Sequence, residues 1–316
     1  MRNACFDSVR FRALCGDGLN IRGAIDDLIV DSCTFTDIGQ TALRLGNGNA
    51  WSLSSHIENA VVSNNYMDNI AWYLRLNCAL YVSVAKDTRI LHNTIKNCSY
   101  TGISAGWKWS SATWKLGETY NLYHVEIAYN YIENFMSDMA DGGAIYTLGG
   151  NVETTYTETL NTMHHNYVVP GKYTGTLKNS FINGTYRARF MPLYHDGASS
   201  NWHSYNNVVA VCGENPGLAS FYLQIGSADL GTQQAHNLLI EENYFTGVNW
   251  QTETNPQTGA GYSSMNDYLE RQVFWNHTRT QFNSIQRNNH CLVRAQDSAE
   301  CLAIMAGAGC AADVAR

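Results

Sequence analysis

The sequence carries little charge for its length. Lys, Arg, Asp and Glu make up only 15% of the residues, against roughly 25% in an average soluble domain. The net charge is −7, and Lys and Arg form no cluster along the chain. These features argue against nucleic acid or an anionic membrane as the partner, because both bind to basic surfaces.

Other common signals are also missing. Proline occurs only four times, which disfavours a fold rich in long turns. No run of 18 apolar residues is present, so the sequence predicts no transmembrane helix, and no signal peptide is visible at Met1. The nine cysteines form no CxxC pair, so we expect mostly reduced, buried thiols, and neither a metal site nor a cofactor.

The polarity of the chain comes instead from uncharged groups. The sequence holds 32 Asn and 19 Tyr, with many Ser and Thr. Amide and hydroxyl groups form hydrogen bonds, and aromatic rings stack on apolar faces, without adding charge. A surface of this kind suits sugars better than ions, so we expect a carbohydrate partner.

An eight-residue pattern recurs along the chain, in which apolar residues precede a polar pair that usually ends in Asn. The copies are LIVDSCTF (28–35), AVVSNNYM (60–67), TRILHNTI (88–95), VEIAYNYI (125–132), NTMHHNYV (161–168), WHSYNNVV (202–209), LLIEENYF (238–245) and the weaker SIQRNNHC (284–291). The sixth positions are Cys33, Asn65, Asn93, Asn130, Asn166, Asn207, Asn243 and Asn289. Their spacing of 28 to 46 residues is that of a solenoid coil with insertions. We expect the Asn residues to stack at a turn and to be structural.

A second strand-like segment follows several copies of the repeat. These segments are ALRLG (42–46), GISAG (102–106), AIYTLG (144–149), PLYHDG (192–197) and FYLQIG (221–226). Two or three short strands per coil predict an all-β parallel β-helix that forms a single domain over residues 1–316. A doubly wound α/β fold is disfavoured, because no amphipathic helix pattern precedes residue 297.

The two ends of the predicted solenoid differ. Residues 297–310 include an apolar pattern at helical spacing after Ser298, which predicts a helix that caps the C-terminal end. The N-terminal CFDSVRF already has the character of a strand. We therefore expect a chain that lacks its native N-terminal coils, or a partner that covers the first coil.

Alignment of the second-strand segments predicts which side chains face outward. Aliphatic residues stack inward at Leu43, Ile103, Ile145, Leu193 and Phe221. The residues that follow them would then face outward, and Asp196 and Gln224 would share a second outward row. We predict a sugar-binding groove whose substrate-binding residues are Trp107, Trp109, Tyr146, Tyr194, His195 and Gln224. The alternative is an aromatic ladder that only covers the sheet.

Two carboxylates stand beside glycines on successive coils, Asp141 before Gly142-Gly143 and Asp196 before Gly197. Glycoside hydrolysis needs an acid and a base or nucleophile, which are typically carboxyl groups. We predict Asp141 and Asp196 as this catalytic pair, with Asp196 as the acid. In extended strands the two residues would lie too far apart, so the two glycines would have to fold Asp141 back over the sheet.

Three segments together resemble a known family. YTGISAGWKWS, DMADGGAIYTLGG and MPLYHDGASSNWHSYNNVV resemble the bacterial right-handed parallel β-helix proteins of glycoside hydrolase family 141, and the likeness extends from about residue 28 to 310. The resemblance implies a pectate-lyase-like solenoid and activity on plant cell-wall glycans, with fucosidase or xylanase specificity. It also implies catalysis by Asp141 and Asp196 and a secreted or periplasmic location.

Two other functions fit the same fold prediction. A polysaccharide lyase would need clustered carboxylates for calcium and a basic residue near the sugar, for which Lys108, Arg187 and Arg189 are candidates. A non-catalytic β-helix would bind glycan without turnover. The sequence does not indicate the oligomeric state.

Overall fold

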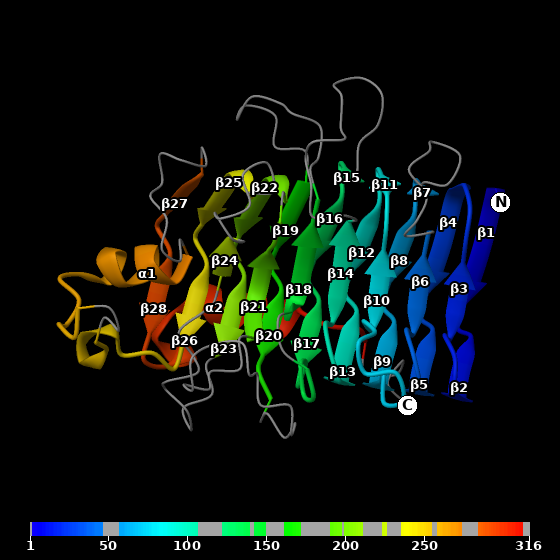
Figure 1. The fold of residues 1–316 in the computed structure, drawn as a ribbon, viewed down its shortest axis with the longest axis horizontal. Helices are drawn as coiled ribbons and strands as arrows, with labels where there is room; N and C mark the ends of the chain where they lie inside the picture. The colour runs from blue at the N-terminus through cyan, green and yellow to red at the C-terminus, as the bar shows by residue number, and fades with distance from the viewer. Residues whose placement is uncertain are drawn as a thin grey trace.

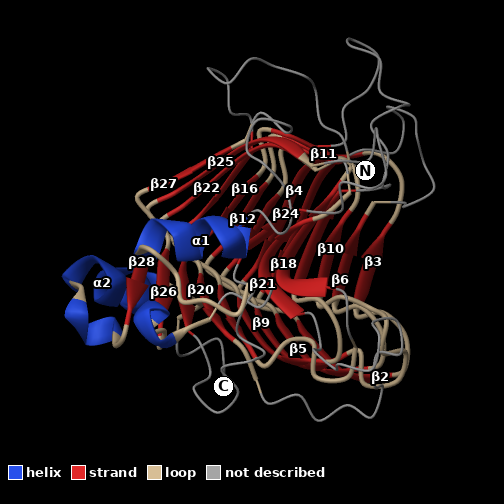
Figure 2. Cartoon of the chain, turned by 60° about the vertical axis from the view of Figure 1, so that its left-hand side comes forward, coloured by secondary structure: helices blue, strands red, loops and turns tan. Residues whose placement is uncertain are grey.

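Three parallel sheets lie side by side along the long axis of the molecule (Figure 1). The structure is a computed structural model that describes residues 2–46, 57–106, 122–139, 142–149, 161–171, 190–197, 199–210, 223–225, 235–254, 258–273 and 284–311. The chain passes from one sheet to the next within each coil, and in three coils two consecutive short strands belong to the same sheet. Each strand pairs in parallel with the equivalent strand of the next coil (Figure 2).

The strands fall into sheets A, B and C. Sheet A contains β1 (Arg2–Asp7), β4 (Ile25–Asp31), β7 (Ile57–Glu58), β8 (Val61–Ser63), β11 (Ala85–Lys86), β12 (Arg89–Leu91), β15 (Leu122–Tyr123), β16 (Glu126–Ala128), β19 (Asn161–His164), β22 (Ser200–Tyr205), β25 (His236–Glu241) and β27 (Ile285–Arg287). Sheet B contains β2 (Arg10–Leu14), β5 (Thr34–Ile38), β9 (Tyr66–Ile70), β13 (Thr94–Cys98), β17 (Tyr131–Glu133), β20 (Tyr167–Val169), β23 (Val208–Ala210), β26 (Tyr244–Thr246) and β28 (His290–Leu292). Sheet C contains β3 (Leu19–Ile21), β6 (Leu43–Leu45), β10 (Leu80–Val82), β14 (Ile103–Gly106), β18 (Gly142–Leu148), β21 (Phe190–His195) and β24 (Leu223–Ile225). The chain visits A, B and C in turn, which confirms the predicted parallel β-helix.

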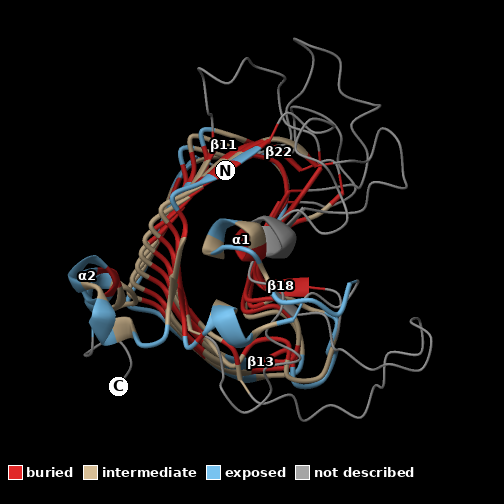
Figure 3. Ribbon diagram, turned by 90° about the vertical axis from the view of Figure 1, so that its left-hand side faces the viewer, coloured by how far each residue is buried: buried red, intermediate tan, exposed pale blue. Residues whose placement is uncertain are grey.

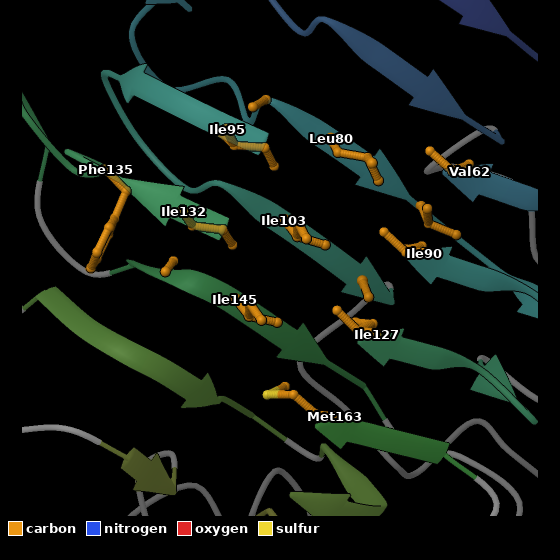
Figure 4. Packing of buried hydrophobic residues seen from close by; sticks show 14 of the residues in the cluster. Val62, Leu80, Ile90, Ile95, Ile103, Ile127, Ile132, Phe135, Ile145 and Met163 are labelled. Atoms are coloured by element: carbon orange, nitrogen blue, oxygen red, sulfur yellow. The ribbon is translucent and has the colours of Figure 1, made fainter. Parts of the chain in front are cut away.

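The core fills the space that the three sheets enclose. Each sheet turns every second side chain inward, and the inward residues of successive coils stack in rows (Figure 4). One row of sheet B runs through Phe35, Met67, Ile95, Ile132, Val168, Val209 and Phe245, all fully buried. Each coil therefore buries its apolar side chains against the coils on either side, as expected for a solenoid.

The predicted Asn stack is present at the turn between sheets A and B. The side-chain oxygen of Asn130 accepts hydrogen bonds from the backbone N–H and the side-chain amide of Asn93, both at 3.0 Å. The Asn130 amide in turn donates to Asn166 at 2.9 Å and to the carbonyl of Ile90 at 3.0 Å. The same pattern links Asn65 through Asn289, and the backbone N–H of Cys33 donates to Asn65. We call this row the Asn ladder.

The left-handed backbone conformation at this turn belongs to the residue before each ladder position. Asn64, His92, Tyr129 and His165 have φ between 53° and 57°. The ladder Asn residues do not share this conformation, so a left-handed backbone does not explain why Asn recurs. Their amide groups explain the repeat, because each one satisfies buried polar atoms on two coils.

Two α-helices lie near the C-terminal end. α2 (Ala299–Gly307) begins after Ser298, whose hydroxyl accepts from the N–H of Cys301. It packs on the outside of sheet B, where Ile304 joins Val208 and Tyr244. The predicted helix therefore forms, but it does not cover the end of the core.

The helix that covers the end of the core is α1 (Met265–Val273), which the sequence analysis did not predict. Its Tyr268 and Leu269 belong to the main hydrophobic core, and it lies across the centre of the coil in a view along the long axis (Figure 3). The Ser264 hydroxyl accepts from the N–H of Asp267 at the start of the helix. Near this end lie two short 3₁₀ helices, η3 (Trp250–Thr252) and η5 (Ala295–Asp297).

Two smaller expectations can also be compared with the structure. Of the cysteines in the described ranges, Cys33, Cys98 and Cys301 are buried, whereas Cys5 and Cys15 are exposed. All eight are free, but burial holds for only part of the set. No helix within the described residues is long and apolar enough to cross a membrane.

The Asn ladder yields a stability prediction. Asn130→Ala removes an acceptor from Asn93 and leaves the buried carbonyl of Ile90 without this donor. We expect the free energy of unfolding to fall by about 2–4 kcal/mol, because buried polar groups lose their partners. Urea denaturation measures the change, with Asn249→Ala at an exposed site as the control. Equal effects of the two substitutions would contradict the role of the ladder.

Candidate functional site

The candidate site lies on the outward face of sheet C, where β14, β18, β21 and β24 are neighbours. Strand pairing aligns Ser104 with Tyr146, and Tyr146 with Tyr194. The residues before them, Ile103, Ile145 and Leu193, belong to the main core, so alternation turns these three residues outward, as predicted. The last coil differs from the prediction, because Leu223 rather than Phe221 pairs with Leu193, and Gln224 pairs with Tyr194.

The main contact of this face joins Tyr146 to Asp196. The hydroxyl of Tyr146 donates a short hydrogen bond to Oδ2 of Asp196, the residue that follows β21. The backbone of Asp196 is fixed as well, since its N–H donates to the carbonyl of Thr147 at 3.0 Å and its carbonyl accepts from Ser199 at 2.8 Å. The strand pairing thus places a partly exposed carboxylate beside a tyrosine hydroxyl.

The two tyrosines of the site are packed rather than open. Their rings meet edge to face, with centroids 5.1 Å apart, and together with Leu148 they form a small apolar cluster. Tyr146 and Tyr194 are 6% and 5% exposed, so in this structure neither offers a free face to a sugar ring. Burial, followed by the charge of Asp196 and the hydrogen bond to it, raises the pKa of Tyr146 well above 10. In its contact with Asp196, Tyr146 is the hydrogen-bond donor.

His195 faces the interior, opposite to Tyr194 and Asp196. It is fully buried; its Nδ1 lies 2.6 Å from Oγ1 of Thr147, and its Nε2 lies 2.9 Å from Oγ of Ser204. Its ring packs against that of Trp202. The prediction that His195 binds substrate is therefore wrong in this structure, because alternation along β21 turns it inward. It links sheet C to sheet A inside the core.

Asp141 lies outside the described residues, so its carboxyl group is not placed. The next residue, Gly142, begins β18 and pairs with Phe190. Phe190 precedes Asp196 by six residues, which is roughly 20 Å along an extended strand. The two glycines are strand residues, so they do not form the turn that would bring the predicted pair together. A side chain at Gly142 would collide with Thr101 and Tyr100, at 2.7 Å, so this glycine serves the packing of successive coils.

The remaining predicted residues can be described only in part. Trp107 and Trp109 lie outside the described residues, and Gln224 is placed only by its backbone in β24. Within the described ranges, no group of three or more His, Cys, Asp or Glu side chains is arranged to hold a metal ion.

Sequence reasoning missed Tyr81 on this face. Tyr81 pairs with Ser104 in the adjacent strand β14, and the guanidinium of Arg44 lies 5.2 Å from the centre of its ring. The signal was present in the sequence, since Leu80-Tyr81 repeats the aliphatic–aromatic pair of Leu193-Tyr194. The outward row of sheet C therefore continues from the candidate site toward the N-terminal coils.

Comparison with known proteins supports the fold. No family model matches the chain, and no curated protein matches it. A solved structure described as a glycoside hydrolase is similar, with a TM-score of 0.57 and 17% identity, and the match covers 99% of this chain. This chain spans only 39% of the length of that protein. A pectate lyase from Bacillus sp. N165, solved in complex with trigalacturonate, matches with a TM-score of 0.41 and 14% identity over 85% of this chain and 65% of its own.

The burial of His195 leads to a pH prediction. Burial lowers the pKa of His195 from 6.5 to about 3, so the unfolded chain binds a proton between these values that the folded chain does not bind. The contribution of neutral His195 to the free energy of unfolding should be fully present above pH 6.5. It should fall as the pH decreases toward 3, by up to about 1.4 kcal/mol per pH unit. Urea denaturation from pH 4 to 8 measures the slope.

The matched variant for this measurement is His195→Gln. Burial also lowers the pKa values of His164, His165 and His203, and their effect on stability has the same sign. The contribution of His195 is therefore the difference between the slopes of the wild type and the variant. Identical slopes would show that His195 is not buried in its neutral form.

Proposed function

We propose that the chain is the β-helical core of a glycoside hydrolase that acts on poly- or oligosaccharides of the plant cell wall, with fucosidase- or xylanase-like specificity. The observation that carries the proposal is the hydrogen bond from Tyr146 to Asp196 on the outward face of sheet C. The resemblance of the DGGAIYT and YHDGASS segments to family 141 supports the same reading. Membership in that family, and a secreted or periplasmic location, stay predictions.

Asp196 is the catalytic carboxylate in this proposal. It faces outward and is partly exposed, whereas Tyr146 and Tyr194 are buried and packed against each other beside it. In the contact between them, Tyr146 is the donor and Asp196 is the acceptor. We therefore assign Asp196 the role of general base or nucleophile instead of the acid that the sequence suggested, and Tyr146 the role of positioning it.

Hydrolysis needs a second carboxyl group roughly 5 to 9.5 Å from the first. Asp141 is the candidate from the sequence, but its neighbour Gly142 lies at the far end of β18 from the site. We keep Asp141 in the proposal as a residue to be tested beside Asp196. A loss of turnover in Asp141→Asn as large as that in Asp196→Asn would restore the predicted pair.

The proposal predicts different losses for the two residues of the contact. On a panel of plant cell-wall oligosaccharides, Asp196→Asn should lower kcat by about 10²- to 10⁴-fold, the range of general acid–base catalysis. Tyr146→Phe should lower kcat by up to about a hundredfold and leave KM nearly unchanged, because it only misplaces the carboxylate. Release of reducing ends measures the turnover.

Sheet B supplies a matched control for this assay. The hydroxyl of Tyr66 donates to Asp68 at 3.2 Å, away from sheet C. Tyr66→Phe and Asp68→Asn repeat the two substitutions there and should leave activity unchanged. Full activity of Asp196→Asn would contradict the proposal. Products that absorb in the ultraviolet and disappear on chelation would indicate a lyase, and binding without turnover would indicate a glycan-binding protein.

A further inference from the structure

A patch of exposed apolar side chains lies in the connection between β9 and β10. Trp72, Tyr73, Leu74 and Leu76 are 41%, 63%, 46% and 69% exposed. We call residues 72–76 the Trp72 patch. Single exposed apolar residues are common, but several together on one short segment indicate a binding surface.

The Trp72 patch is held in place by specific hydrogen bonds. The N–H groups of Tyr73 and Leu74 both donate to the carbonyl of Gly39, at 3.2 and 2.9 Å. The carbonyl of Leu74 accepts from the backbone N–H and the side-chain amide of Asn77 at 3.2 and 2.9 Å. The two aromatic residues are thus carried on a backbone that is already ordered, which lowers the entropic cost of binding.

The chemistry of the Trp72 patch suits an uncharged sugar. The rings of Trp72 and Tyr73 are inclined by 58°, with centroids 5.9 Å apart, so they offer two apolar faces at an angle. Arg75 lies between them and Leu76 in the sequence and pairs with Asp138 at 3.1 Å, with side chains 56% and 23% exposed. This ion pair cancels the local charge and leaves donors and acceptors for hydroxyl groups.

The patch is also connected to the face that bears the candidate site. Asn77, just after the patch, accepts a hydrogen bond from Arg44 at 3.0 Å, and Arg44 covers the ring of Tyr81. Tyr81 lies two coils from Tyr146 in the outward row of sheet C. Along the strand direction, however, the patch and Asp196 lie at opposite edges of sheet C, because Arg75 pairs with Asp138, which precedes Gly142 at the start of β18. This separation is roughly 20 Å, so an oligosaccharide would have to cross sheet C to touch both.

We propose that the Trp72 patch is a subsite for a neutral oligosaccharide at the corner between sheets B and C, on the N-terminal side of the Asp196 site. Trp72 and Tyr73 stack on apolar sugar faces, and Arg75 and Asp138 bind hydroxyl groups. The substrate class rests on the proposed function, whereas the binding of glycan by the patch does not depend on catalysis.

Calorimetric titration of the 316-residue chain with xylohexaose, a neutral hexasaccharide, tests the subsite. Trp72→Ala combined with Tyr73→Ala should weaken binding by at least about tenfold, because two stacking rings are lost. Leu302→Ala removes a side chain of similar exposure, 41%, on α2 and should leave the affinity unchanged. Trigalacturonate, which is anionic, should bind more weakly than xylohexaose.

Several outcomes would overturn the subsite. Unchanged affinity in the double variant, absence of binding in the wild type, or stronger binding of trigalacturonate would each do so. Light scattering tests whether a second copy of the chain occupies the patch instead. A concentration-dependent dimer that the double variant abolishes would show that the patch is a contact between copies. If Asp196→Asn stays active while the double variant loses binding, the proposed function fails and the subsite stands.

Discussion

The amide-to-amide hydrogen bonding of the Asn ladder is the constraint on which the rest of the structure depends. An Asn side chain has one acceptor and one donor group, and the ladder uses both, so that each buried amide satisfies its own coil and the next. The interaction is satisfied only when equivalent residues lie directly above one another. It therefore fixes the register of each coil at the same point, before the strand of sheet B begins. The rows of side chains in sheets B and C, which follow the ladder in each coil, therefore have the same register.

The outward face of sheet C shows how much depends on this alignment. At the end of β21, Tyr194 and the following residue Asp196 point outward and His195 points inward, so a slip of one residue would bury the carboxylate and expose the imidazole. The interior is built for one arrangement only: Thr147 and Ser204 are fully buried and hydrogen-bond the two nitrogens of His195. In any other register these polar groups would lose their partners inside the core. The inward network thus stabilises the outward position of Asp196.

The same alternation explains what the sequence could and could not predict. The Asn repeat is local, with its apolar residues, turn and Asn within eight positions, so the fold and the ladder could be predicted correctly. The pairing of the last coil could not be predicted, because Phe221, Leu223 and Ile225 alternate with polar or aromatic residues in the same way, so the pattern allows any of them to be an inward residue. A shift of two residues preserves the alternation, so the pattern excludes a slip of one but not of two. Helix α1 was not predicted because its helical pattern is too short. The helix has nine residues, and of those whose side chains are described only Tyr268 and Leu269 are buried.

The lengths of the connections show why the chemistry-bearing residues gather around sheet C. In each described coil, two residues join the strand of sheet A to the strand of sheet B, from Ser32-Cys33 to Asn288-Asn289. An insertion there would break the ladder. The connections from sheet B to sheet C vary, with four residues after β5, nine after β9 and eight after β17. Extra residues at this corner change neither the ladder nor the core rows, because the strands on both sides keep their pairing. The Trp72 patch lies in one of these longer connections. The Tyr146–Asp196 contact, in contrast, is held by the paired strands of sheet C.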